Sequence, residues 1–500
     1  MIQIVKSFFY LILLLSLGLS YLIFTPSGNT HLYDFLSHTF SQKTDLNVKV
    51  QSIDMQNFPN IIATMNVEHR ANLVTVGKVG FTTLELDYTF TSDRISYDSA
   101  HIHDDLHIVG HVSGQYNNMY VTGHGSILDG TIVYETTKRT DSIENMVMSM
   151  KGISSHKLFK LMGQETLING KADVYVNVAF MNETDKQGTF TYDVTDNNFS
   201  GIPLHLHTKV TIDNMQHRFS TDIDSPSLSL KVSEGTYDQE KKLAKASYTL
   251  DVKDLADLET LLGYKYLGEF NATGEILYDK HLSITGVSKT YGGVLDYFFE
   301  KNGLILGLHN VSFKSFISIF PYEPILNAST SGNIFYNFIK KTLIVNTKLK
   351  NAKLLQSKFT KNIYKKSRVN MTKETFKDAK LDAGYHDGIF SAEVKLGEGN
   401  RHAYLTNAII NTHNNTINTY FDFMLQEKAF SGNVNGAYDN PKVDLNVKEA
   451  LEYQVNHTVK SLIGKKNKEN IDKVVNAIPL GNTAKEVFSD SAASFVKMLF

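Results

Sequence analysis

Apolar and polar residues alternate along most of this chain, from about residue 46 to residue 447. The pattern is clearest from Leu84 to Phe90, where every even position is apolar and every odd position is polar. Because successive side chains of a β-strand point to opposite faces of a sheet, this pattern predicts strands with one face away from water. The same alternation recurs in further runs, which are Val174, Val176 and Val178; Val210 and Ile212; Leu228, Leu230 and Val232; Tyr248, Leu250 and Val252; and Val443, Leu445 and Val447.

Short turn signals separate the predicted strands. Pairs such as Asn117-Asn118, Asp129-Gly130 and Asp387-Gly388 are typical of tight hairpins, and only eight prolines interrupt the chain. Strands joined by such turns form an antiparallel meander. The sequence therefore predicts a mainly β fold, an elongated and curled antiparallel sheet with short helices between its repeats.

A degenerate repeat lies over this meander. Each copy has a short amphipathic helix, a spacer, and a glycine that leads into an alternating strand, and the helices are predicted over 153–163, 252–263 and 311–320. The repeat glycines are unevenly spaced, so the pattern is not that of a strict solenoid. We expect the repeat to extend the sheet by stacking similar pieces.

The N-terminus carries a candidate membrane anchor. Residues 7–24 read SFFYLILLLSLGLSYLIF and contain no charge, and a helix of that length spans about 27 Å, close to the hydrocarbon thickness of a bilayer. Gly18 and Ser20 would also fit the cleavage site of a signal peptide, although four apolar residues still follow them. Lys6 precedes the run and the next basic residue is Lys43, which favours a cytoplasmic N-terminus and an extracytoplasmic body.

Composition and motifs argue against catalysis and against nucleic acid. The chain has 50 basic and 52 acidic residues, and a net charge of −2 creates no field that would recruit DNA or RNA. Its sequence contains no cysteine, no glycine-rich phosphate loop and no motif of a zinc protease or a serine hydrolase. We therefore expect that the protein is not an enzyme, uses no cofactor and binds no nucleic acid.

One group of histidines is a candidate metal site. Odd-numbered positions on a strand share a face, so two imidazoles could meet a metal there. The competing interpretation, which we favour, is that these are polar side chains on the wet face of a strand. The group comprises His101, His103, His107 and His111, with Asp104 and Asp105 beside them.

The apolar face of the predicted sheet is the strongest candidate for a functional surface. Such a face is covered by a second sheet, closes on itself, or lines a groove. A groove would suit acyl chains, because each buried methylene contributes about 0.8 kcal/mol. Ordinary packing against a neighbouring sheet or helix is the competing interpretation. The candidate lining residues are Leu84, Leu86, Tyr88, Phe90, Val174, Val176, Val178, Leu228, Leu230 and Val232.

Short motifs near both ends carry a family resemblance. After the apolar run come Leu32–Leu36, then Leu46–Ile53 and Phe58-Pro59, and near the other end Phe430–Leu445 contains spaced glycines before Pro441. In this order the chain resembles the AsmA-like proteins of Gram-negative envelopes, whose larger relatives include TamB and YhdP. The helix-then-glycine repeat fits the same family.

That resemblance implies a function in the bacterial envelope. It implies a single-pass inner-membrane protein with a periplasmic β-groove, acting in phospholipid transport between membranes or in outer-membrane lipid homeostasis, without catalytic residues. The implied partners are phospholipid acyl chains, the inner membrane through residues 7–24, and an outer-membrane or envelope protein. The alternative is a non-catalytic scaffold that assists outer-membrane protein assembly by offering strand edges.

The chain is thus predicted to fall into five segments. After Val447 the hydrophobic period changes from 2 to 3.6, which predicts amphipathic helices that cap the last strand edge or reach a membrane or partner. The segments are a cytoplasmic N-terminus (1–6), a transmembrane anchor (7–24), an amphipathic and strand module (25–60), a repetitive β-groove body (61–447) and the C-terminal helices (448–500).

Overall fold

The computed structural model describes residues 26–446, apart from short gaps at 45–46, 56, 69, 98–99, 165–167, 200, 322–323, 325, 357–359, 362–363, 365–369, 427 and 438–440. The predicted anchor (7–24) and the predicted C-terminal helices (448–500) lie outside the described residues. Within the described part of the chain, no helix is long and apolar enough to cross a membrane.

The protein is built mainly from strands, as predicted. The 26 strands of the described residues belong to one antiparallel sheet, and the sheet is open. The chain divides into two compact units, Met1–Ala244 and Lys245–Phe500. The boundaries of the five predicted segments stay predictions.

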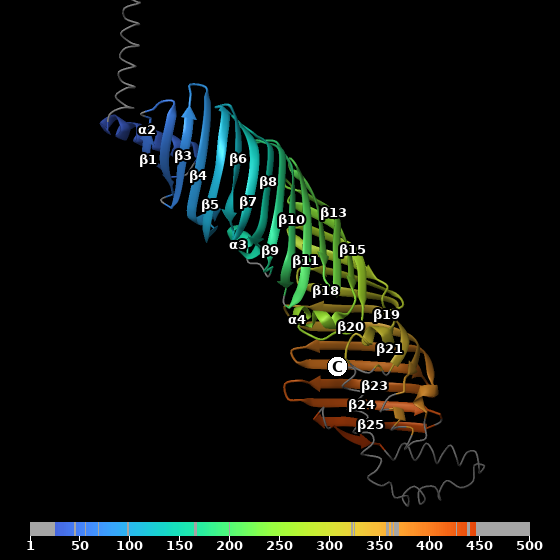
Figure 1. The fold of residues 1–500 in the computed structure, drawn as a ribbon. Coiled ribbons are helices and arrows are strands. Elements are labelled where there is room, and N and C mark those ends of the chain that lie inside the picture. The colour runs from blue at the N-terminus through green and yellow to red at the C-terminus, as the bar shows by residue number, and fades with distance from the viewer. Residues whose placement is uncertain are drawn as a thin grey trace, which may run out of the picture. The chain divides into compact units, whose positions relative to one another are not determined.

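The described residues of the first unit form one long helix, one short helix and thirteen strands (Figure 1). They are α2 (Pro26–Thr44), β1 (Val48–Asp54), β2 (Asn60–Val67), β3 (Ala71–Val79), β4 (Thr83–Tyr97), β5 (Ala100–Gln115), β6 (Asn118–Ile127), β7 (Gly130–Arg139), β8 (Ile143–Ser154), α3 (Ser155–Leu161), β9 (Lys171–Met181), β10 (Lys186–Phe199), β11 (Ile202–Asp213), β12 (Gln216–Asp224) and β13 (Leu228–Asp238).

The second unit continues the same alternation of strands and short helical turns. Its elements are β14 (Leu243–Val252), at whose start the boundary falls, η1 (Leu255–Leu258), α4 (Glu259–Leu262), β15 (Phe270–Asp279), β16 (His281–Ser288), β17 (Val294–Glu300), β18 (Gly303–Ser312), α5 (Phe313–Ile317), β19 (Leu326–Asn337), β20 (Thr342–Leu354), η2 (Met371–Lys373), β21 (Thr375–His386), β22 (Ile389–Glu398), β23 (Arg401–Asn411), β24 (Thr416–Leu425), β25 (Lys428–Ala437) and β26 (Lys442–Leu445).

Both units are meanders. In the first unit, each strand from β1 to β13 pairs antiparallel with the next strand along the chain. The strands from β15 to β26 of the second unit do the same. The predicted turns at Asn117-Asn118, Asp129-Gly130 and Asp387-Gly388 join β5 to β6, β6 to β7 and β21 to β22, so these three turns and the antiparallel pairing are confirmed.

Short helices follow β8, β14 and β18, where the degenerate repeat predicts them. Each begins at a polar N-cap whose side chain accepts a backbone N–H: Ser154 from Lys157, Asp254 from Ala256, and Ser312 from Ser315. Such caps satisfy donors that a helix start leaves free, which lets even one turn of helix form at a strand end. The three predicted helices are confirmed.

Helix α2 covers the free edge of the sheet at β1. Three hydroxyl groups, spaced one helical turn apart, replace the missing neighbour strand. Ser41 Oγ accepts the N–H of Val48 at 3.0 Å, and Ser37 Oγ accepts the N–H of Val50 at 2.8 Å. Tyr33 accepts the N–H of Ile53 at 3.0 Å and donates to the carbonyl oxygen of the same residue at 3.1 Å. Unpaired backbone groups at an edge invite further strands, so α2 blocks that pairing.

Helix α3 closes one end of the first unit over a buried cluster. Ile153 and Val194 are fully buried there, with Leu158 and Phe159 of α3 packed against them. Lys157 of α3 forms ion pairs with Asp104 at 2.8 Å and with Asp129 at 2.6 Å. The second unit has its own buried clusters, which lie beneath α5 and along β20–β25.

Candidate functional site

The strand register decides which side chains of the first unit share a face. Tyr88 on β4 lies opposite Thr75 on β3 and Gly110 on β5. Val176 on β9 lies opposite Met148 on β8 and Phe190 on β10. Followed from β3 to β13, these partners bring all ten predicted lining residues to one side of the sheet, here called the apolar face.

The ten residues lie on three strands that are not neighbours, so they share the face without forming one contact cluster. Leu84 to Phe90 lie on β4, Val174 to Val178 on β9, and Leu228 to Val232 on β13. Nine of them are half-buried, and Val174 is buried at 2% exposure within the cluster under α3. Ordinary packing therefore describes Val174, whereas the other nine keep part of their surface accessible.

A hollow of about 360 Å³ opens on the apolar face over β3 to β7. Four predicted residues of β4, from Leu84 to Phe90, line it. The alternation within β4 could not identify the partners that neighbouring strands contribute, because cross-strand register sets them. These further lining residues are Leu73, Thr75, Ile108, Val112, Val121 and Tyr134, and Thr75 is the one that is neither aliphatic nor aromatic.

The floor of the hollow is a pair of tyrosines that meet across two glycines. Tyr88, Gly110, Gly123 and Tyr134 lie in one row across four strands. The two hydroxyl groups are 2.5 Å apart, and Tyr88 also donates to the carbonyl oxygen of Thr122 at 2.9 Å. We call this row the tyrosine bridge. Its glycines leave room for both rings to lie along the sheet, and its polar atoms are satisfied by each other and by the backbone.

The second unit contains the same tyrosine bridge. Gly274 and Gly286 lie opposite each other on β15 and β16, followed by Tyr297 on β17. Tyr248 of β14 is hydrogen-bonded to Tyr297 and donates to the carbonyl oxygen of Thr285 at 3.1 Å. In both bridges the acceptor is the residue just before the second glycine. The two units therefore share a side-chain arrangement, the tyrosine bridge, that the sequence pattern did not predict.

Burial raises the pKa of three bridge tyrosines, Tyr88, Tyr248 and Tyr297. Burial, together with the hydrogen bond to Tyr134, raises the pKa of Tyr88, and burial with the hydrogen bond to Tyr297 raises the pKa of Tyr248. Because tyrosine is ordinarily neutral at physiological pH, these shifts keep both groups uncharged at still higher pH. The hollow thus presents hydrocarbon and neutral aromatic surface.

The opposite face of the first unit is polar. Glu85 and Asp87 are exposed on β4, and Asp87 contacts His111 Nδ1 at 2.9 Å. Further along, Asp193 contacts His205 at 2.8 Å and His207 at 3.2 Å. These cross-strand pairs are what a wetted sheet face is expected to carry.

The histidine group that was a candidate metal site does not converge in the described residues. Asp104 is buried and bound to Lys157, His103 and Asp105 are exposed, and His111 contacts Asp87. Among the residues that the structure describes, no group of three or more His, Asp and Glu side chains is placed to hold a metal ion.

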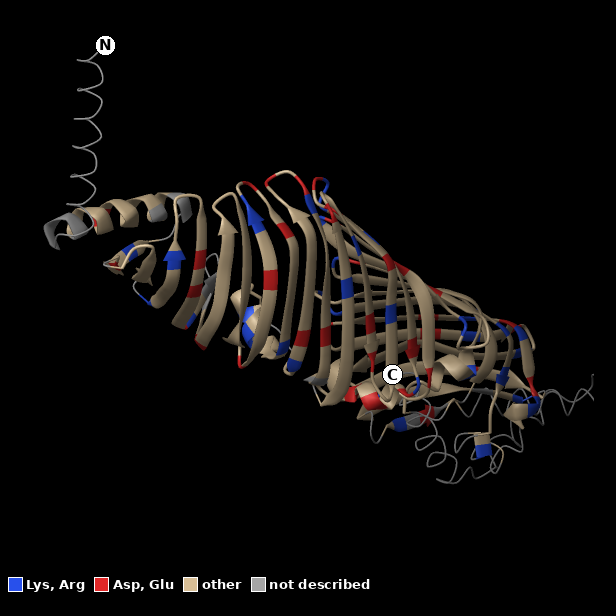
Figure 2. Ribbon diagram, turned by 45° about the horizontal axis from the view of Figure 1, so that its top comes forward, with Lys and Arg blue, Asp and Glu red and all other residues tan. Residues whose placement is uncertain are grey.

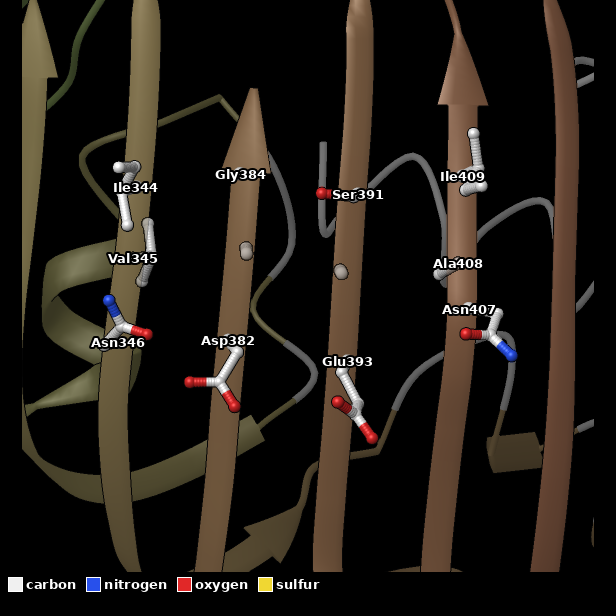
Figure 3. A pocket seen from close by; sticks show the side chains of 12 residues that line it. Ile344, Val345, Asn346, Asp382, Gly384, Ser391, Glu393, Asn407, Ala408 and Ile409 are labelled. Carbon is white, nitrogen blue, oxygen red and sulfur yellow. The ribbon is translucent and has the colours of Figure 1, made fainter. Parts of the chain in front are cut away.

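A second hollow, of about 390 Å³, lies over β20 to β23 of the second unit and has both apolar and polar lining residues. Figure 3 shows Asn346, Asp382, Glu393 and Asn407 in one row across four strands. Two lysines form ion pairs with its acidic groups. Lys380 lies 2.6 Å from Asp382, and Lys395 lies 2.5 Å from Glu393. Its charges are paired at the surface, which makes the hollow on the apolar face the better candidate site.

Comparisons with family models, with curated proteins and with solved structures give no match for this chain.

Proposed function

We propose that this protein is a membrane-anchored lipid carrier, in which the apolar face binds phospholipid acyl chains. The observation that carries the proposal is the hollow over β3 to β7, an apolar surface that the described chain leaves accessible. A hollow of this size falls within the roughly 300–1,000 Å³ of small-molecule sites, and such sites are mostly apolar with few polar groups. Monomeric proteins rarely expose an extended apolar surface without a partner for it.

The extent of the face supports an elongated ligand. Half-buried apolar side chains continue from β4 through Val176 and Phe190 to Leu230. Eleven strands from β3 to β13, at a spacing of about 4.8 Å, carry this face over roughly 50 Å. An acyl chain could therefore lie across several strands while its headgroup stays in water.

The cellular setting of this proposal comes from the sequence. The uncharged run at 7–24 would anchor the chain in the inner membrane, with a cytoplasmic N-terminus and a periplasmic body. The resemblance to AsmA-like proteins supports a role in phospholipid transport between membranes or in outer-membrane lipid homeostasis. An outer-membrane or envelope protein would be the partner at the far end.

The alternative role as an assembly scaffold finds less support at the β1 edge of the sheet. Such a scaffold offers a free strand edge for pairing, but α2 occupies the edge of β1 through Tyr33, Ser37 and Ser41.

Lipid analysis of the purified full chain tests the proposal. We expect phospholipid to copurify in mild detergent and to be detected by mass spectrometry. Leu86→Asp should lower bound lipid several-fold with little change in thermal stability, because this half-buried side chain lines the hollow. Val133→Asp is the matched control, since Val133 is 58% exposed and lies on the polar face. A lipid-free wild type, or equal lipid in both variants, would overturn the proposal.

A further inference from the structure

Three hairpin loops meet at one end of the first unit. They are the β1–β2 loop (55–59), the β3–β4 loop (80–82) and the β5–β6 loop (116–117). Val79 donates to the carbonyl oxygen of Pro59 at 2.9 Å, which joins the first two loops. Tyr116 joins the second and third, because its N–H donates to Thr82 at 3.2 Å and its hydroxyl to Gly80 at 2.8 Å.

These loops present aromatic side chains to the outside. Phe81 is 95% exposed, Phe58 is 52% exposed, and their rings pack edge to face with centroids 6.3 Å apart. Tyr116 is 46% exposed beside them. A phenylalanine held almost fully in water at a loop tip gains nothing from folding, so its surface is available to a partner. We call Phe58, Phe81 and Tyr116 the aromatic rim.

The chemistry of the rim differs from that of the later hairpins. The three loops contain no charged residue, whereas the β7–β8 loop carries Asp141 and the β9–β10 loop carries Glu183 and Asp185. Figure 2 shows the red and blue of charged residues at hairpin tips further along the sheet. The nearest charges within the strands are Asp54, Lys78 and Glu85, which lie one or more residues in from the loops.

The position of α2 indicates what the rim would meet. Tyr33 of α2 lies against Ile53, near the end of β1, while Ser41 lies against Val48 at its start. The helix therefore runs antiparallel to β1, and Pro26, its first residue, lies toward the rim end. The uncharged run at 7–24 ends two residues before α2 begins.

We infer that the aromatic rim inserts into the lipid–water interface of the membrane that holds residues 7–24, an inference that rests on the proposed anchor. Aromatic rings favour this layer because they offer an apolar body at headgroup depth. The rim also adjoins the hollow, since Leu84, one of its lining residues, follows Phe81 by three positions. Acyl chains would thus pass from the bilayer to the apolar face past Phe58 and Phe81.

A single tryptophan can measure this depth, because the chain contains none. The full-length Phe81→Trp variant is reconstituted into liposomes that contain phospholipid brominated on its acyl chains. We expect the brominated lipid to quench the indole fluorescence of this variant at least twofold, and the membrane to protect the indole from aqueous iodide. Met162→Trp is the control, since Met162 ends α3 at the opposite end of the unit and is 57% exposed; it should show the reverse.

Flotation of the same liposomes separates the rim from the anchor. If the Phe81→Trp chain floats with the liposomes while its indole is quenched only by iodide, insertion of the rim is contradicted and the membrane anchor is supported. A chain that does not float, and whose indole the brominated lipid does not quench, overturns both. Equal quenching of both variants by brominated lipid would also contradict insertion of the rim. It would show that the protein contacts the membrane with no preference for the rim end of the unit.

Discussion

Gly123 and Gly286 give room, in the two units, for a pair of tyrosine rings to lie along the sheet. A Cβ added at Gly123 would lie 2.6 Å from both Tyr88 Oη and Tyr134 Cζ, and the nearest atoms are all side-chain atoms. At Gly110 the added carbon would instead collide with the backbone carbonyl oxygen of Thr122. A side chain at Gly123 would therefore displace the tyrosine rings, whereas a side chain at Gly110 would disturb the backbone of the sheet.

Gly123→Ala should lift the two rings into the hollow and weaken lipid binding. Overpacking of this kind costs about 1–3 kcal/mol, so the variant should fold with a lowered free energy of unfolding. Bound lipid, measured by mass spectrometry, should fall several-fold. Gly286→Ala makes the matched change in the second unit and should leave lipid at the hollow of the first unit unchanged. Unchanged lipid binding in Gly123→Ala would show that the bridge does not form the floor of the site.

Asp193 gives the polar face a dependence on pH. Burial acts to raise the pKa of Asp193, but hydrogen bonds from His205 and His207 outweigh it and hold the pKa below its ordinary value. A carboxyl whose pKa is lowered by folding stabilises the protein above its unfolded pKa, near 4, and loses that contribution as the pH falls through the folded value. Wild type should therefore lose more stability than Asp193→Asn as the pH falls below about 4. Denaturant titrations at each pH check this, and parallel curves would contradict the role of the pair.

At the scale of elements, alternation in the sequence predicted the strands and their apolar side, and glycine and asparagine pairs predicted the hairpins. The alternating pattern does not show which residues lie opposite each other on neighbouring strands. Tyr88 and Tyr134 are 46 residues apart, and only the register of three hairpins, including the bulge between β4 and β5, brings the two hydroxyls together. Val174 shows a second limit, because an alternating pattern does not reveal which of its apolar residues a helix such as α3 will bury.

Helix α2 is an element whose role the amphipathic pattern at 32–36 only partly revealed. Its hydroxyl groups at Tyr33, Ser37 and Ser41 satisfy the backbone of β1, and each such bond contributes about 1 kcal/mol. Replacing Ser37 and Ser41 with alanine should expose the edge and promote self-association through β1, visible by analytical ultracentrifugation. Thr39→Ala is the control, because among the described residues Thr39 donates within the helix, to the carbonyl oxygen of Phe35. A double variant that stays as monodisperse as this control would contradict the edge-sealing role.

At the scale of the whole molecule, the two units share the same arrangement of elements. Each has an antiparallel meander, a tyrosine bridge over a glycine pair, and a short serine-capped helix after the strand that follows the bridge. Tyr134 and Tyr297, like Gly123 and Gly286, are 163 residues apart, a spacing visible in the sequence once the bridge is known. The repeat thus preserves the tyrosine bridge in each unit.

The most direct test of lipid binding is photocrosslinking in the membrane. p-Benzoyl-phenylalanine is placed at Leu86, within the hollow, or at Val133 on the polar face, and the full chain is irradiated in native membranes. The account predicts a phospholipid adduct, identified by mass spectrometry, at position 86 and little or none at position 133. No adduct at position 86, or equal adducts at both positions, would contradict it.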